Sequence, residues 1–357
     1  STVRRVLLLR YDAIGDMITT LPTIRTLKRL NPDIEVDVMA SPKNRRVVEN
    51  DPNVTRILEL RNRPDQFVSD ILKARRVGYD VVICCIFGKA TKIGIIANWI
   101  GGTRAIKTTI WRGEKYGRFF NLQSKSAQLE PSMWDKMLRL IPETFRYELQ
   151  PGDEQPYIAV DAASREDARR SLVEIGFGDS SFIAINITSV NERNRWPSAS
   201  FRKLIEAILA YDHDIRIVLL WMGNDRTIAE QLANNVPSSD RGRIALYPAT
   251  RNVMEIVAVV EQSEAVFSLD TGVVHMASAT GRPVMALYVA GSRAITEWRP
   301  YGVPYRAIES DADKAFVATI PPERVIPVFL GLLDEIRESE SEIGGREIRE
   351  GDEKNFS

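Results

Sequence analysis

The chain alternates short apolar runs with segments in which apolar residues recur at helical spacing. Residues 5–10 form the first apolar run, and Leu21, Ile24 and Leu27 follow at a spacing that places them on one face of a helix. The alternation repeats over residues 34–99, with apolar runs at 34–40 and 81–87 and helical patterns at 41–49, 66–76 and 89–99. Strands that alternate with helices predict a parallel sheet with helices on both of its faces.

The pattern starts again after residues 142–156, a stretch rich in proline and glycine that we interpret as an interdomain linker. The sequence therefore predicts an α/β fold of two doubly wound, Rossmann-like domains. Sheets of this kind bind ligands at the carboxyl ends of their strands, so we expect the site in a cleft between the domains. The strands predicted beyond the linker are 182–187, 215–222, 243–246, 265–269 and 284–289.

The domain boundaries follow from the same pattern. We expect an N-terminal domain over residues 1–150, a C-terminal domain over 151–320 and a C-terminal helix over 321–340. Residues 341–357 are acidic and poor in apolar side chains, which predicts a disordered tail. Residues 107–128 interrupt the strand and helix pattern and predict a long loop.

The charge of the chain is balanced in total but not in distribution. Its 48 Lys+Arg match 48 Asp+Glu, yet residues 1–150 carry 26 basic and 16 acidic side chains, a net of +10. Residues 151–357 then carry 22 and 32, a net of −10. Basic clusters such as 43–46 and 73–76 are either solvated helix faces or regions that attract an anionic surface or acceptor.

Cysteine usage and hydropathy exclude several classes of protein. Cys84 and Cys85 are adjacent in an apolar run, where neighbours in a strand point to opposite faces, so a disulfide framework and a Cys-based metal site are excluded. No run of about eighteen uncharged apolar residues occurs, and the first residues do not resemble a signal peptide. We therefore expect a cytoplasmic protein without a transmembrane segment.

Asp16 is the first candidate for chemistry. It follows the first apolar run and Gly15, at the point where the first helix begins. One interpretation is a helix cap, because aspartate is favoured at the positive end of the helix dipole. The other is a proton acceptor for a substrate hydroxyl, because the carboxyl end of a strand is where ligands bind and the loop lacks the glycine spacing of a dinucleotide site.

A second strand end carries Asp270, Thr271 and Gly272, with His275 one turn further along the next helix. Small residues and free backbone N–H groups at a helix N-terminus favour an anion. The alternative is a capping aspartate with a packed histidine. A third strand end, after residue 187, offers the hydroxyls of Thr188 and Ser189, which suit a diphosphate or an ordinary polar loop.

Taken together, these loops resemble glycosyltransferase family 9, the ADP-heptose:lipopolysaccharide heptosyltransferases, and the resemblance covers nearly the whole chain. The motif Asp270-Thr271-Gly272-x-x-His275 is the most specific part of it. The other matching motifs are Gly15-Asp16 with Leu21-Pro22, Arg195-Trp196-Pro197, Trp221-x-Gly223-x-Asp225 and Trp298-x-Pro300.

The resemblance implies a GT-B fold, with the acceptor on the first domain and the nucleotide sugar on the second. It implies an inverting transfer of heptose from ADP-heptose to the lipopolysaccharide inner core, with no metal and no cofactor. Asp16 is then the general base and Gly15 belongs to the acceptor loop. The nucleoside contacts are Asp225 and Thr250, and the contacts to the donor diphosphate are Thr188, Ser189, Arg193, Arg195, Asp270, Thr271, Gly272 and His275.

One departure from the family pattern lies before the Trp-Pro pair. Members often carry a lysine there that neutralises the leaving diphosphate, whereas this chain has Arg193 and Arg195 on either side of Asn194. An arginine can hold the same oxygens with two hydrogen bonds, so either one is a candidate.

Three alternatives to the heptosyltransferase interpretation stay open. The first is a family 9-like glycosyltransferase that uses another nucleotide sugar. The second is such an enzyme with another acceptor, for example a different surface glycan or a protein. The third is a GT-B binding protein without catalysis. The partners expected in the main interpretation are the donor, an anionic lipid-linked glycan and the cytoplasmic face of the inner membrane as a peripheral contact. Nucleic acid is disfavoured by the neutral total charge.

Overall fold

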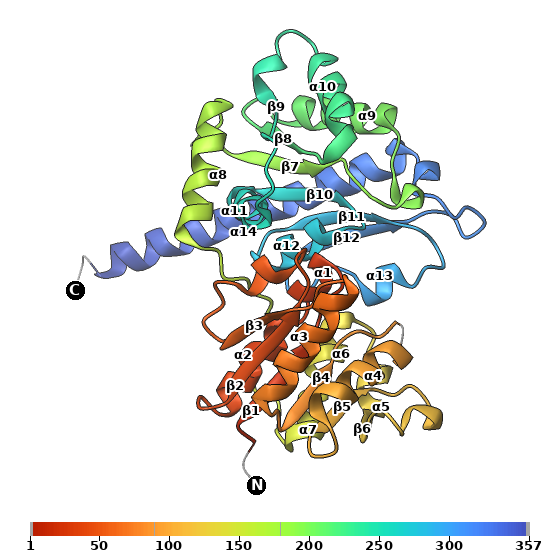
Figure 1. Cartoon of the computed structure of the whole chain (residues 1–357). Helices are drawn as coiled ribbons and strands as arrows, with labels where there is room; N and C mark the ends of the chain where they lie inside the picture. The colour runs from red at the N-terminus through yellow and green to blue at the C-terminus, as the bar shows by residue number, and fades with distance from the viewer. Residues whose placement is uncertain (1–2, 89, 179, 355–357) are drawn as a thin grey trace.

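The computed structural model describes residues 3–88, 90–178 and 180–354. Within these residues the chain forms two parallel six-stranded sheets, one in each domain, with helices packed on their faces (Figure 1). This confirms the predicted fold class of two Rossmann-like α/β domains.

Both sheets have the strand order of a doubly wound fold. The first sheet consists, in spatial order, of β3 (Arg56–Glu59), β2 (Glu35–Ala40), β1 (Arg5–Leu9), β4 (Val81–Cys84), β5 (Ile106–Ile110) and β6 (Leu122–Ser124). The second consists of β12 (Tyr305–Glu309), β11 (Val284–Tyr288), β10 (Ala265–Leu269), β7 (Phe182–Asn186), β8 (Arg216–Leu220) and β9 (Ile244–Leu246).

The helices alternate with these strands. The first domain contains α1 (Ile14–Ile18), α2 (Leu21–Leu30), α3 (Pro64–Val77), α4 (Ala90–Gly101), α5 (Lys125–Leu129), α6 (Met133–Leu138) and α7 (Leu140–Phe145). The second contains α8 (Ala162–Glu174), α9 (Ser198–Tyr211), α10 (Arg226–Asn234), α11 (Val253–Gln262), α12 (Gly272–Ala279), α13 (Ala294–Glu297) and α14 (Pro322–Lys354).

The strand order places two loops where a ligand crevice forms. In the first sheet Leu7 of β1 pairs with Asp37 of β2 on one side and with Val82 of β4 on the other, so the order reverses beside β1. In the second sheet the order reverses between β10 and β7, where Val266 pairs with Ala184. Ligands of open α/β sheets bind at these switch points. The loops that follow β1 and β10 are therefore the structural candidates for the site.

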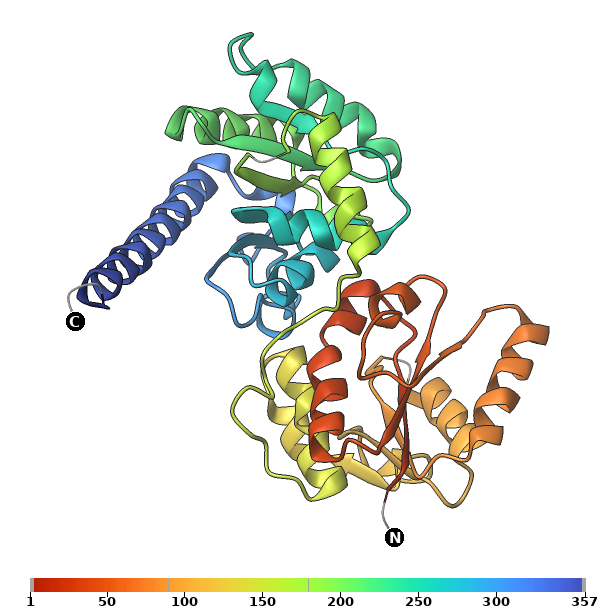
Figure 2. The ribbon, with the colours of Figure 1, turned by 90° about the vertical axis from the view of Figure 1, so that its left-hand side faces the viewer.

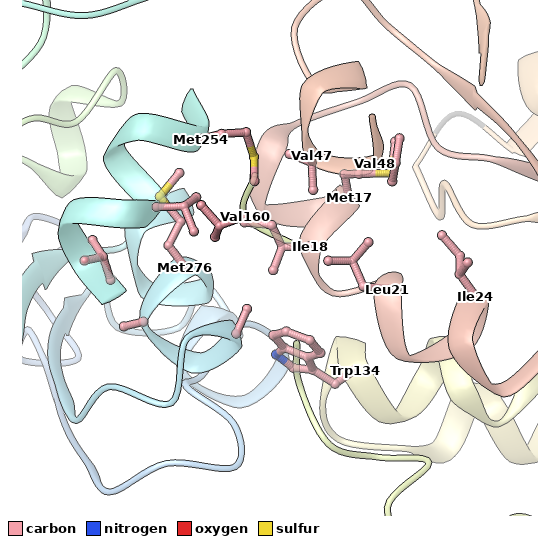
Figure 3. Close-up of a cluster of buried hydrophobic side chains, with 14 of the residues drawn as sticks. Met17, Ile18, Leu21, Ile24, Val47, Val48, Trp134, Val160, Met254 and Met276 are labelled. Atoms are coloured by element: carbon pink, nitrogen blue, oxygen red, sulfur yellow. The ribbon is translucent and has the colours of Figure 1, made fainter. Parts of the chain in front are cut away.

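A buried apolar cluster joins the two domains. Figure 3 shows Ile18 of α1 and Val47 of the first domain directed toward Val160, Met254 and Met276 of the second, and all five side chains are buried in one cluster. Removing such side chains from water is the main favourable contribution to domain contact. The cluster therefore holds the helix after β1 against the helices of the second domain.

Polar and aromatic contacts extend the domain interface on the side of α6. Lys136, which is buried, makes a 2.8 Å ion pair with Glu297 across the boundary. The Tyr301 hydroxyl donates a 2.6 Å hydrogen bond to Asp135, and the Tyr301 ring stacks on Trp134 with 5.9 Å between ring centroids. Because these groups come from both domains, the loops after β1 and β10 are held face to face.

The structure corrects three expectations about the chain. Residues 107–128 are not one long loop, because they hold most of β5, a short 3-10 helix, β6 and the start of α5. The pattern missed β5 because its buried threonines, Thr108 and Thr109, are polar; the Thr109 hydroxyl donates to the Cys84 carbonyl oxygen at 3.1 Å. Residues 142–145, placed in the linker, belong to α7.

The third correction concerns the C-terminus. Helix α14 does not end near residue 340 but continues to Lys354, so the segment predicted to be a disordered tail is helical as far as that residue. Glutamate, lysine and arginine are strong helix formers, and they are frequent in this segment. The last part of the predicted tail, residues 355–357, lies outside the described residues.

Candidate active site

Asp16 lies in the first turn of α1, the helix that follows the loop after β1. Its carboxylate is 19% exposed and lies 3.5 Å from the Arg10 guanidinium, which also contacts Asp12 at 3.2 Å. Burial raises the pKa of Asp16 to about 6; the nearby Arg10 opposes the shift and Asp12 adds to it. The N-cap position of α1 is Ala13, so Asp16 is not the helix cap that one interpretation proposed. A partly exposed carboxyl with a pKa near neutrality suits a general base.

The buried Arg10 contacts both carboxylates, those of Asp12 and Asp16. Its side chain is 1% exposed, and its Nε donates to the Thr20 hydroxyl at 2.8 Å while Nη2 contacts the Met137 sulfur at 3.0 Å. Thr20 in turn donates to the backbone carbonyl of Asp16 at 2.9 Å. These contacts fix the position of the guanidinium, whose Nη1 lies within reach of both Asp12 and Asp16.

The backbones of the two domains come close together where Gly15 meets α12. A Cβ added to Gly15 would lie 2.7 Å from Cδ2 of His275, and one added to Gly272 would lie 3.5 Å from the Gly15 backbone nitrogen. Real Cβ atoms do not make contacts as short as 2.7 Å, so glycine at position 15 permits this approach. The loop that carries Asp16 therefore abuts the N-terminus of α12.

The turn before α12 is held by amide side chains. Thr271 caps the helix, accepting a hydrogen bond from the Val273 N–H at 3.4 Å and one from the Asn186 amide at 3.0 Å. Asn194 donates to the carboxylate of Asp270 at 3.3 Å, and burial raises the pKa of Asp270 to about 6. The N-terminus of α12 thus presents backbone N–H groups at a fixed position, which is the general arrangement for binding an anion.

His275 is a neutral, buried side chain. It is 4% exposed and packs edge-on against Trp134 at 6.0 Å and Trp298 at 5.8 Å between ring centroids. Burial lowers the pKa of His275 to about 4, so the ring carries no charge at neutral pH. Among the described residues its Nδ1 finds no hydrogen-bond partner. His275 therefore offers a hydrogen-bonding nitrogen rather than a positive charge.

The two arginines of the third loop do not reach the turn before α12. Arg195 makes a 2.9 Å ion pair with Asp225, and Arg193 donates to the carbonyl oxygen of Ala315 at 2.9 Å. Asn194, between them, is the residue that contacts Asp270. The family resemblance implied a diphosphate contact for Arg195 and a nucleoside contact for Asp225, whereas the structure pairs these two side chains with each other.

The remaining predicted residues lie at the carboxyl ends of β7, β8 and β9. The buried hydroxyl of Thr188 accepts from the Met222 N–H at 3.0 Å, and that of Ser189 accepts from the Asn191 N–H at 3.2 Å. Thr250 donates to the Glu255 carboxylate at 2.5 Å. All of them therefore face the same edge of the second sheet as Asp270.

Sequence reasoning missed three residues that organise this site. Arg10 was noted only as the last residue of an apolar run, Asn186 only as part of the strand predicted over 182–187, and Asn194 only as a loop residue between two arginines. A charged residue that ends a buried strand was the one available signal for Arg10. The asparagines have no comparable signal, because their partners, such as Thr271, lie more than 70 positions away in the sequence.

No helix in the described part of the chain is long and apolar enough to cross a membrane. In the same residues, no group of three or more His, Cys, Asp and Glu side chains is arranged as metal ligands would be. Both cysteines are buried and free, and burial raises the pKa of the Cys85 thiol to about 12.

Comparison with known proteins gives a family match over most of the chain. Residues 75–319 match the model of glycosyltransferase family 9 (heptosyltransferase). Lipooligosaccharide heptosyltransferase 2 of Haemophilus influenzae is 21% identical over 302 residues, which are 79% of this chain and 82% of that relative.

Two solved structures share the fold over nearly their whole length. A family 9 glycosyl transferase from Veillonella parvula superposes with a TM-score of 0.77 at 17% identity, covering 93% of this chain and 97% of that one. The E. coli heptosyltransferase WaaC with ADP superposes with a TM-score of 0.71 at 18% identity, covering 93% and 98%.

Proposed function

The chain belongs to glycosyltransferase family 9, and on that premise we propose that it transfers heptose from ADP-heptose to an anionic, lipid-linked glycan of the lipopolysaccharide inner core. The transfer inverts the anomeric carbon and uses no metal. The observation that carries the proposal is the contact between Gly15 and α12, which sets the Asp16 loop of one domain against the helix N-terminus that we propose for the diphosphate.

The chemistry needs groups on two sides of one carbon. When the bond from the anomeric carbon to the diphosphate breaks, negative charge grows on the leaving ADP and positive charge on the sugar ring. The acceptor oxygen forms the new bond from the opposite face, and its proton passes to Asp16. One bond to oxygen forms as one breaks, so no electrons are exchanged and ADP leaves as the anion.

The second domain supplies the groups for the leaving diphosphate. Backbone N–H groups at Thr271 and Gly272 stabilise its charge, and His275 is proposed as a further residue of this site, on the same helix. Arg193 and Arg195 are exposed and reach the diphosphate only if they leave their present partners. The hydroxyls of Thr188 and Ser189 face the same crevice, and Asp225 and Thr250 are the residues proposed for the nucleoside.

Asp270 shows how the donor would affect the site. Its carboxyl is buried beside the anion-binding turn, and its pKa is already raised to about 6. A bound diphosphate raises that pKa further, because a second negative charge disfavours ionisation. We therefore propose that Asp270 binds the donor as the neutral acid and donates a hydrogen bond to a phosphate oxygen.

The acceptor and the location follow from the charge of the first domain. Its surplus of ten basic side chains favours an anionic acceptor, in line with the phosphorylated inner core. A lipid-linked acceptor lies at a membrane, so we propose that the protein works in the cytoplasm at the inner face of the inner membrane.

Calorimetry against nucleotides tests the donor directly. ADP is expected to bind in buffer that contains EDTA, with UDP and GDP at least about tenfold weaker. The WaaC structure with ADP supports this expectation for a protein of the same fold. Tighter binding of UDP or GDP would overturn the donor, and no nucleotide binding would contradict the transferase itself. Incubation with ADP-heptose and an inner-core acceptor then tests the transfer.

The pH profile tests the state of the base. Asp16 accepts a proton only when ionised, so kcat/KM for the acceptor, measured at saturating donor, is expected to fall as the pH drops through about 6, with a slope of one. Initial rates between pH 4.5 and 8.5 measure it. The fall in rate at low pH, the acid limb of the profile, should persist in Asp270→Asn. This variant removes the other carboxyl whose pKa is about 6, so a limb that remains does not come from Asp270. Rates that stay constant down to pH 4.5 would contradict the raised pKa of Asp16.

A further inference from the structure

Helices α3 and α4 expose apolar side chains on the outside of the first domain. Val68 and Leu72 of α3 are 51% and 47% exposed, and Ile95 and Trp99 of α4 are 37% and 51% exposed. These are four of the nine large hydrophobic residues that are exposed in the described part of the chain, and they lie on two helices packed side by side. Together with Arg75 and the buried Ile71 they form the α3–α4 face.

The face is shaped and held in place. Val68, Ile71, Leu72, Arg75 and Trp99 line a shallow depression of about 250 Å³ whose surface is almost entirely apolar. The Arg75 guanidinium donates to the backbone carbonyl of Trp99 at 2.6 Å, which ties the end of α4 to α3. Scattered exposed hydrophobic residues need no explanation, but a contiguous cluster on a fixed surface marks a contact site.

Basic side chains surround the apolar cluster. Residues 61–104 contain eight Lys+Arg and three Asp+Glu. Arg76 follows Leu72 by one helical turn, and Lys92 precedes Ile95 by one turn; both side chains are exposed. Of the two carboxylates on α3, Asp70 is buried in a 2.7 Å ion pair with Arg61.

The second carboxylate of α3 is also accompanied by a basic residue. Asp65 lies 3.9 Å from Arg63, and both side chains are well exposed. Helix α4 carries no acidic residue. The rim of the face is therefore positive, with tryptophan and leucine at its centre.

We propose that the α3–α4 face is a docking surface for an anionic lipid bilayer. Tryptophan and leucine enter the interfacial layer while the surrounding arginines and lysines meet the acidic headgroups. The proposal deepens the proposed function, because it assigns to particular residues the membrane contact that a lipid-linked acceptor requires. An apolar centre with basic residues around it is the composition of helical surfaces that bind anionic membranes.

The position of the face is compatible with access to the cleft. Figure 2 shows α3 and α4 on one side of the first sheet, with α2 and the helices α6 and α7 on the other. Helix α3 follows β3, so it begins at the carboxyl ends of the strands, where the loop after β1 also lies, and it runs back toward the opposite end of the sheet. A bilayer along this side covers neither α1 nor α12, so a lipid-anchored glycan can extend around the edge toward Asp16.

Vesicle flotation with the full chain tests the surface without any substrate. Binding to vesicles of phosphatidylcholine and phosphatidylglycerol, mixed 3:1, is expected to be at least about tenfold tighter than binding to phosphatidylcholine alone, and to weaken in 0.5 M salt. The double variant Leu72→Ser/Trp99→Ser and the double variant Arg76→Glu/Lys92→Glu should each lose at least about tenfold in affinity.

A matched control lies on the second domain. Val173 and Phe316 are 52% and 50% exposed, close to the values of Leu72 and Trp99, so Val173→Ser/Phe316→Ser should bind vesicles like the unmodified chain. Thermal melting checks that each variant folds. The proposal would be overturned if Val173→Ser/Phe316→Ser lost as much vesicle affinity as Leu72→Ser/Trp99→Ser. It would also be overturned if the unmodified chain bound neutral and anionic vesicles equally well.

Two further readouts separate other outcomes. Quenching by brominated lipid should lose a component in Trp99→Phe, since this side chain enters the bilayer. A concentration-dependent dimer that Leu72→Ser/Trp99→Ser abolishes, without vesicle binding, would show a self-association surface and overturn the proposal. Failure of the transferase assay leaves the vesicle result intact, because flotation contains neither donor nor acceptor.

Discussion

The variant Asp16→Ala is expected to lose turnover by about two to four orders of magnitude, the usual contribution of a general base, while it still binds ADP. The acceptor hydroxyl keeps its proton in this variant, so the attack on the anomeric carbon slows. Donor binding survives because its contacts come from the second domain, around Thr271 and Gly272. Steady-state rates with saturating donor and acceptor, together with calorimetry against ADP, measure the two effects separately.

Asp12→Ala is the matched control for this prediction. It removes a carboxylate from the same Arg10 contact, at 3.2 Å against 3.5 Å for Asp16, but not the proposed base. Turnover should change by less than about tenfold, and the acid limb should move to lower pH, because Asp12 contributes to the raised pKa of Asp16. Equal losses in the two variants would assign the effect to the charge network rather than to proton transfer.

The sequence predicted those parts of the candidate site that follow directly after a strand, together with the glycine beside Asp16. Period and spacing identified β1 and β10, and the residues that follow a strand in a doubly wound sheet must lie at its carboxyl edge. Asp16 and Asp270 could therefore be placed on facing loops without coordinates. Gly15 was also identified, although only the structure shows that its missing side chain admits the ring of His275.

Pairings between distant side chains could not be predicted. Asp225 and Arg195 were assigned to different parts of the donor, but they form an ion pair with each other. Nothing in the local pattern indicates this, because side-chain partners depend on how β7 and β8 bring their loops together. The same holds for Asn194, whose contact with Asp270 depends on the packing of two loops 76 positions apart.

The electrostatic state of a residue is equally a property of the folded chain. His275 matched a family motif at the donor diphosphate, but the motif does not give its charge; Trp134 of the other domain and Trp298 bury the ring and keep it neutral. The prediction of strands from apolar runs fails for polar strands for a related reason. Thr108 and Thr109 read as loop residues, yet the sheet buries both and supplies partners for their hydroxyls.

Replacing Arg10 with methionine is expected to destabilise the fold by about 3 kcal/mol and to move the acid limb of the pH profile upward. Arg10 is 1% exposed and is the cation shared by Asp12 and Asp16, so its loss leaves two partly buried carboxylates facing each other. Without the guanidinium, which lowers the pKa of Asp16, that pKa rises above about 6 and a smaller fraction of the base is ionised at neutral pH. Urea unfolding and rate profiles measure the two effects.

The sign of the pH dependence distinguishes this cause from lost packing. The pKa of Asp16 in the folded chain lies above its value of 3.8 in an unfolded chain, so this carboxyl costs stability once the pH rises past that unfolded value. Arg10→Met enlarges the cost, and the difference from the unmodified protein should shrink as the pH falls from 7 to 4. Arg165→Met removes a surface ion pair with Glu261 and should cost less than about 1 kcal/mol at any pH. A loss in Arg10→Met that does not change with pH would instead assign the effect to the lost contacts of Arg10 with Thr20 and Met137.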